Sequence, residues 1–175
     1  MGHTIPAGRV NWHRLFERFE HTCFRLETLQ WYDEPGEAGA YESFLAGREP
    51  EVYPGKEAWL EIVRTAVAAG KVMQRVHVVA EPLTDYLRFE IGWKYELNAA
   101  AGEDIRISRA VSALPQTDYW LFDSRALARL RYNAAGRLVS VELDNDPAMV
   151  VQAGYWRDVA LHLAVPLRNW QSVGR

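Results

Sequence analysis

The sequence predicts a single α+β domain with a mixed, mostly antiparallel sheet and helices packed mainly on one face. Its 175 residues are enough for one hydrophobic core, since single domains usually contain roughly 100–200 residues. Apolar residues make up 49% and charged residues 25% of the chain, a balance typical of globular proteins. Helical and strand-like patterns alternate early in the chain, and three strand-like runs follow one another late, which together indicate α+β.

The N-terminal part is expected to contain a helix, a strand and a turn. Residues 1–10 include two glycines and a proline, and we expect a flexible lead-in there to a domain at 11–175. Asn11 is a suitable N-cap for a short helix with an aromatic face. Residues 22–29 alternate between apolar and polar side chains, as in a strand with one polar face, and a turn at 33–36 follows.

The next segment predicts two helices and a strand. Residues 37–46 and 57–69 carry apolar side chains at helical spacing. Gly70 stands where a left-handed helix C-cap belongs, and residues 72–79 then read as a strand. Helix, glycine and strand in this order indicate an α-to-β step.

A further helix, a strand and a β-meander complete the prediction. Thr84 is a suitable N-cap for a helix that extends to about residue 97, and residues 104–108 alternate as a strand does. The three late runs lie at 118–123, 127–132 and 137–143, and the last two are separated by four residues that suit a hairpin loop. Asp146-Pro147 then provides the N-cap and first residue of a final helix, which Pro166 must end or kink.

The composition excludes several classes of function. A net charge of −3 without a basic tail or stripe weighs against direct nucleic-acid binding. The lone Cys23 excludes an intrachain disulfide and a cysteine-rich zinc site, and it indicates a reducing compartment. No apolar run approaches the roughly 20 residues that span a bilayer, and no secretory signal is evident. We therefore expect a cytoplasmic protein with neither a metal nor a cofactor.

Arg75 and His77 are the first candidate site residues, because they project from the same face of one strand. They could bind an anion together, since arginine offers a forked donor and histidine a titratable one. Alternatively, they line the solvent face of a half-buried sheet or pair with acids of an adjacent helix.

Acidic residues near this strand extend the candidate patch. Glu90 lies on the apolar stripe of the following helix, and a buried carboxylate needs a partner, which Arg75 or His77 provides if the helix folds back over the strand. The result is either a structural ion pair or a site. Glu103 and Asp104 form an acidic pair that could bind a metal or act as acid and base, although consecutive strand residues point to opposite faces.

Familiar catalytic motifs are absent from the sequence. It contains no G-x-S-x-G elbow, no P-loop and no G-x-G-x-x-G fingerprint, and its five histidines are scattered. We therefore assign no catalytic residue, and the sequence favours a role other than catalysis.

Four stretches together resemble a family of uncharacterised actinobacterial proteins, a domain of unknown function common in streptomycetes. They are Arg75-Val76-His77-Val78-Val79, residues 82–90, residues 101–105 and Asp118-Tyr119-Trp120-Leu121-Phe122-Asp123. The resemblance covers nearly the whole chain, from Leu15 to about Trp170. Members of that family are often encoded near helix-turn-helix regulators, which implies a regulatory or partner-binding role.

Two functional hypotheses follow. The first is a non-enzymatic regulatory or adaptor domain that binds a protein partner such as a helix-turn-helix regulator. The alternative is a small enzyme or sensor for an anionic small molecule, a nucleotide or phosphorylated metabolite, in which Arg75, His77 and Arg88 bind the anion and Glu90 or Glu103 acts as base. The candidate ligand-binding residues are Arg75, His77, Asp85, Tyr86, Arg88, Glu90 and Glu103.

Overall fold

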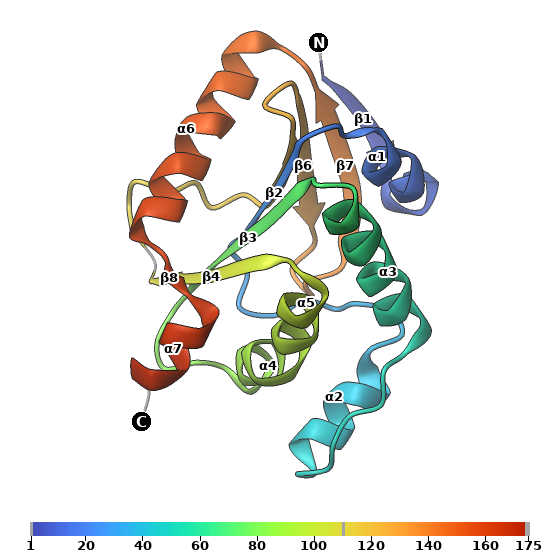
Figure 1. Ribbon diagram of the computed structural model, residues 1–175, viewed down its shortest axis with the longest axis vertical. Helices are drawn as coiled ribbons and strands as arrows, with labels where there is room; N and C mark the ends of the chain where they lie inside the picture. The colour runs from blue at the N-terminus through green and yellow to red at the C-terminus, as the bar shows by residue number, and fades with distance from the viewer. Residues whose placement is uncertain (1, 110, 174–175) are drawn as a thin grey trace.

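The computed structural model, which describes residues 2–109 and 111–173, confirms an α+β fold around one eight-stranded sheet (Figure 1). The strand order is β1-β7-β6-β5-β2-β3-β4-β8. The strands are β1 (His3–Pro6), β2 (Thr22–Glu27), β3 (Val72–Val79), β4 (Asp104–Arg109), β5 (Tyr119–Phe122), β6 (Ala126–Tyr132), β7 (Leu138–Asp144) and β8 (Val165–Pro166).

The helices lie between and after these strands. They are η1 (Ala7–Arg9), α1 (Trp12–Arg18), α2 (Ala38–Leu45), α3 (Pro54–Ala68), α4 (Asp85–Phe89), η2 (Glu90–Lys94), α5 (Tyr95–Ala101), α6 (Pro147–Leu163) and α7 (Leu167–Val173). Within the described residues, none combines the length and apolar composition needed to cross a membrane.

The middle of the sheet is parallel and its remainder antiparallel. Strands β2, β3 and β4 are parallel neighbours, because α2 and α3 connect the first pair and α4 to α5 connects the second. Strands β5, β6 and β7 form the expected antiparallel meander. In the loop between β6 and β7, the side-chain oxygen of Asn133 accepts hydrogen bonds from the backbone N–H groups of Ala135 and Arg137, as a hairpin requires.

Strand β1 lies within the segment that we expected to be a flexible lead-in. It pairs antiparallel with β7, from His3 opposite Leu143 to Pro6 opposite Ser140. Strand β1 joins an otherwise open edge of the sheet through main-chain hydrogen bonds. Its side chains do not alternate between apolar and polar, so the sequence pattern did not reveal a strand there.

The helices cover the two faces of the sheet unequally (Figure 1). Helix α6 packs on one face, where Phe24, Leu26 and Val76 form its apolar floor. Helices α1 and α3 cover the other face, and α4 to α5 continue that layer, which confirms a sheet with helices mainly on one side.

One local feature departs from the predicted helix at 84–97. The helical stretch continues to Ala101, but η2 within it is π-helical, since the N–H of Tyr95 donates to the carbonyl of Glu90 five residues earlier. Such π-helical turns are rare and occur frequently at functional sites. Here the turn carries Glu90 and Lys94 over the ends of β2 and β3.

Candidate functional site

A cavity of about 610 Å³ lies between the sheet and the helices on its charged face. Ligand-binding cavities commonly have volumes of about 300–1,000 Å³. Its wall combines aromatic side chains with buried charged groups. The lining residues used below are Arg25, Glu27, Tyr32, Lys56, Ala58, Trp59, Arg75, Glu90, Lys94, Tyr95, Asn98, Trp120 and Tyr132.

Arg75 lies on β3 and forms two ion pairs. Its Nε donates to Oε1 of Glu103 at 2.8 Å, and its Nη1 donates to Oε1 of Glu27 at 2.7 Å. Its guanidinium lies over the rings of Trp59 and Trp120, with 5.7 and 5.5 Å to the ring centroids. Paired carboxylates and stacked indoles thus hold this guanidinium in one orientation.

Arg25 lies beside Arg75 on β2 and is only partly paired. Its Nη2 donates to Oδ2 of Asp118 at 2.8 Å and to the hydroxyl of Tyr132 at 3.0 Å. The residue is 3% exposed, yet its Nη1 has no hydrogen-bond partner in the part of the chain that the structure describes. Arg25 lines the cavity, but this unpaired Nη1 is itself buried behind the surface of the wall.

His77, Tyr95 and Glu27 form a hydrogen-bonded chain at the carboxyl ends of β2 and β3. The hydroxyl of Tyr95 donates to Oε2 of Glu27 at 2.7 Å and lies 2.6 Å from Nδ1 of His77. Nε2 of His77 lies 2.7 Å from the carbonyl oxygen of Leu29. Since a carbonyl oxygen can only accept, Nε2 carries a hydrogen.

The two buried glutamates beside this chain differ in their surroundings. Burial alone would raise the pKa of the Glu27 carboxyl, but Arg75 and Arg25 hold that pKa well below its ordinary value. For Glu90, burial raises the pKa despite the opposing charges of Lys94 and His77. Oε2 of Glu90 lies 3.4 Å from Nδ1 of His77 and forms no hydrogen bond within the described residues.

Lys94 and Lys56 line the same cavity in contrasting settings. Lys94 forms ion pairs with Glu34, Glu37 and Glu90, and these carboxylates outweigh burial and hold its pKa well above the ordinary value. Lys56 donates instead to two neutral oxygens, the carbonyl of Lys94 at 2.8 Å and the side-chain oxygen of Asn98. Burial, together with the charge of Lys94, lowers the pKa of Lys56 to about 7.

The structure brings most of the sequence-predicted site residues together. Arg75 and Glu90 line the cavity, while His77 and Glu103 lie directly behind its wall. Tyr86 is buried nearby, where its hydroxyl donates to Oε1 of Glu37 at 2.6 Å. The helix after Pro82 does fold back over β3, as the buried position of Glu90 requires. Whether these residues bind a ligand stays a prediction.

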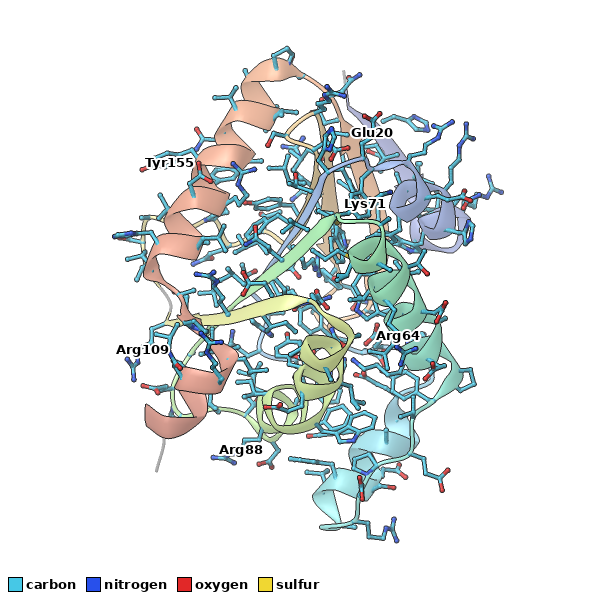
Figure 2. All side chains as sticks on the ribbon, viewed as in Figure 1. Glu20, Arg64, Lys71, Arg88, Arg109 and Tyr155 are labelled. Carbon is cyan, nitrogen blue, oxygen red and sulfur yellow. The ribbon has the colours of Figure 1, made fainter. Side chains whose placement is uncertain are left out.

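Asp85 and Arg88 do not belong to this group, which corrects the expected anion site. They form an exposed ion pair of 2.7 Å on the outside of α4, and Arg88 points away from the cavity (Figure 2). The reason is helical geometry, because Tyr86 and Glu90 face inward and positions 85 and 88 therefore face solvent.

The two adjacent acidic residues Glu103 and Asp104 lie in different surroundings. Glu103 is buried against Arg75, whereas Asp104 pairs with Arg106 at the partly exposed edge, so the two point to opposite faces as expected. Asp118 accepts hydrogen bonds from Arg25 and Thr28 inside the protein. In the described residues, no group of three or more His, Cys, Asp or Glu side chains is arranged to hold a metal ion.

Several site residues were missed by sequence reasoning. Arg25 and Glu27 occupy the polar face of the predicted strand at 22–29. Both this strand and the one at 72–79 have a polar face, and that similarity could have indicated that the two faces lie side by side. Lys94 and Asn98 follow Glu90 at spacings of four residues on one helix, a polar row that could have been noticed. Lys56 gave no signal, since an isolated lysine at a helix start is ordinary.

Comparison with solved structures shows that the fold has precedents. Nuc from Salmonella typhimurium, a phospholipase D family member, is similar with a TM-score of 0.59 and 11% identity over 95% of this chain and 97% of that one. NucT from Helicobacter pylori gives a TM-score of 0.57 and 8% identity over 95% and 98%. TrmBL2, an archaeal chromatin protein, gives 0.52 and 9% over 93% of this chain and 53% of its own.

At such low identities these likenesses concern the fold alone. A comparison with curated proteins finds no relative of this sequence. Residues 10–172 do match a family, and the match includes strands β2 to β8 and every residue of the cavity discussed above. The chain therefore belongs to the family described as a domain of unknown function, DUF6879.

Proposed function

We propose that this domain binds a small molecule with an anionic group, a phosphate ester or a carboxylate, in the cavity beside Arg25 and Arg75. The observation that carries the proposal is the presence of three cationic side chains, those of Arg25, Arg75 and Lys94, on the cavity wall. The guanidinium of Arg25 is also incompletely paired, because its buried Nη1 has no hydrogen-bond partner among the described residues. A buried polar group without a partner destabilises a fold by about 1–3 kcal/mol, and by more when it is charged. An anionic ligand would supply the missing acceptor if the guanidinium turned slightly toward the cavity.

The arrangement of charges supports the same ligand class. Arg25, Arg75 and Lys94 line the cavity, and several of the carboxylates that pair with them, such as Asp118 and Glu103, lie behind the wall. The cavity wall is therefore rich in cationic side chains. Glu27 and Glu90 also line the cavity, so a suitable ligand carries a hydroxyl or other donor near its anionic group.

The aromatic wall specifies the rest of the ligand. Trp59 and Trp120 lie 5.5 Å apart between ring centroids, and Phe16 packs edge-on against both. Such a surface favours a planar or apolar group beside the anion. The name of the phospholipase D family member Nuc motivates the inclusion of phosphate esters among the ligands to test.

The first test blocks the cavity without disturbing the core. Ala58 is exposed on α3 and lines the cavity, while Ala68 is exposed on the same helix away from it. We expect inorganic phosphate, a nucleoside monophosphate or a 2-oxo acid to raise the melting temperature, since ligand at 100 times its Kd adds about 2.7 kcal/mol. Ala58→Trp should abolish the shift, and Ala68→Trp should retain it.

A second test addresses the donor itself. Arg25→Met should weaken anion binding in titration calorimetry, whereas Arg88→Met, which removes an exposed guanidinium on α4, should leave binding unchanged. Should no anion of these classes stabilise the protein, or should the two arginine variants bind equally well, the proposal is wrong.

A second candidate function is the binding of a protein partner, such as a helix-turn-helix regulator. The observation that favours it is on α6, where Val151 and Tyr155 are 72% and 57% exposed one turn apart. Tyr155 projects outward from this helix (Figure 2). We expect Val151→Lys to abolish a mass increase that light scattering detects with the partner, and Gln152→Lys to retain it. If no candidate regulator changes the mass, this function loses its support.

A further inference from the structure

The two lysines of the cavity have opposite electrostatic settings. Lys94 is surrounded by three carboxylates at 2.7–3.2 Å and stays an ammonium ion. Lys56 is 4% exposed and, among the described residues, forms no ion pair with any carboxylate. The contrast raises the question of what a buried lysine without a counter-ion does at a cavity wall.

The hydrogen bonds of Lys56 match a neutral amine. Its Nζ donates to the carbonyl of Lys94 and to the side-chain oxygen of Asn98. Asn98 is held in that orientation because its amide nitrogen donates to Oε2 of Glu103 at 2.7 Å. A neutral amine has two N–H bonds and one lone pair, so these two oxygens use both N–H bonds and leave the lone pair free.

The surrounding charges favour the same neutral form. Burial, together with the charges of Lys94 and Arg75, lowers the pKa of Lys56 to about 7, although Glu103 and Glu34 oppose this shift. A lysine that is desolvated beside another cationic group is a recognised way to obtain a nucleophilic amine at neutral pH. Lys56 is 4% exposed and is one of the residues that line the cavity.

We propose that Lys56 is a nucleophile that forms an imine with a carbonyl compound bound in the cavity. The lone pair of Nζ attacks the carbonyl carbon, a C=N bond replaces the C=O bond, and the two N–H protons leave with the oxygen as water. No oxidant or reductant is needed. This proposal rests on the proposed function. Its substrate is an anionic carbonyl compound, a 2-oxo acid or a phosphorylated aldehyde, whose anionic group binds beside Arg25.

The experiment traps the imine at individual lysines. The chain has only three, Lys56, Lys71 and Lys94, so peptide mass spectrometry can resolve them all. The unmodified protein is incubated with glyoxylate or with neutral propionaldehyde and then reduced with cyanoborohydride at pH 6–10. We expect Lys56 to be labelled more than about tenfold faster than the half-buried Lys71 at pH 7, since an ordinary lysine has a pKa of about 10.4. Lys94 should remain unlabelled.

The pH profile and the two aldehydes separate the parts of the proposal. Labelling of Lys56 should rise with a midpoint near pH 7, and glyoxylate should label it faster than propionaldehyde. Lys56→Arg should abolish the fast labelling, and Lys71→Arg should retain it. The wild-type profile requires no variant, so a variant that fails to fold does not prevent a decision.

Each result has a distinct meaning. If both aldehydes label Lys56 no faster than Lys71, the nucleophile is excluded, even if phosphate still raises the melting temperature and supports the proposed function. If propionaldehyde labels Lys56 rapidly but glyoxylate gains nothing, the nucleophile is supported, whereas the anionic class, and with it the proposed anion site, is overturned.

Discussion

The two faces of strands β2 and β3 are buried to the same degree but by different chemistry. Toward α6 they present Phe24, Leu26 and Val76, which are closely packed and apolar. Toward α3 and α5 the alternate positions present Arg25 and Arg75 with their carboxylate partners. Buried ion pairs can often be replaced by apolar residues with equal or greater stability. The comparison therefore teaches that stability alone does not explain the charged face, which is a reason for the binding role proposed above.

The largest expected effect on stability comes from removing the ion pairs of the charged face. Arg75→Met leaves Glu103 and Glu27 without their shared cation, and removing one partner of a buried pair lowers the free energy of unfolding by about 3–5 kcal/mol. Urea unfolding measures this loss. Arg75→Lys, which keeps the charge, should lose less, and a loss below about 1 kcal/mol for Met would contradict the network.

The matching change on the apolar face is Leu26→Ala. Leu26 is fully buried, so its truncation should lower the free energy of unfolding by about 2–5 kcal/mol through lost burial and a residual cavity. We expect the effect of this truncation not to depend on pH.

The charged face should behave differently, because the stability that Glu27 contributes is present above about pH 4.5 and is lost as the pH falls further, since its folded pKa is depressed. The effect of Arg75→Met should therefore shrink in acid, and equal pH profiles of the two variants would contradict the contrast.

A smaller expected effect is the dependence of stability on pH that Lys56 causes. Its folded pKa of about 7 lies below the ordinary value of 10.5, so the unfolded chain binds more protons between these values. The free energy of unfolding should thus rise from pH 7 toward pH 10, by at most about 1.4 kcal/mol per pH unit. Lys56→Met should flatten this rise, and Lys71→Met should leave it intact. Unfolding in urea at pH 7, 8 and 9 provides the measurement, and identical slopes in wild type and Lys56→Met would exclude the neutral amine.

The smallest effect lies outside both faces. Arg88→Ala removes the exposed ion pair with Asp85, and such pairs contribute about 0–1 kcal/mol to stability. Thermal unfolding should change little, and anion binding should not change at all. A large loss of either property would mean that the patch predicted from the sequence, rather than the cavity, contains the site.

Local patterns predicted much of the fold and a part of the site. The alternation in residues 22–29 and 72–79 identified both strands of the charged face, and the position of Glu90 on an apolar stripe correctly required a buried partner. Arg88 was misplaced because a pattern of neighbours along the chain does not decide which side of a short helix faces a cavity.

The remainder depended on contacts between distant segments. Arg25 meets Asp118 across 93 positions of sequence, and Lys56 meets Asn98 across 42. The π-helical turn at Glu90–Lys94 aims two charged side chains that a regular helix would direct elsewhere.

The sequence by itself determined most of the segments that form helices and strands, and which faces of the central strands are apolar, since periodicity depends on residues only a few positions apart. Tertiary structure alone decided that two polar strand faces share one cavity, that one lysine there pairs with three carboxylates and that the other pairs with none in the part of the chain that the structure describes. These outcomes follow from packing and desolvation, which depend on every segment around a side chain rather than on its neighbours in the chain.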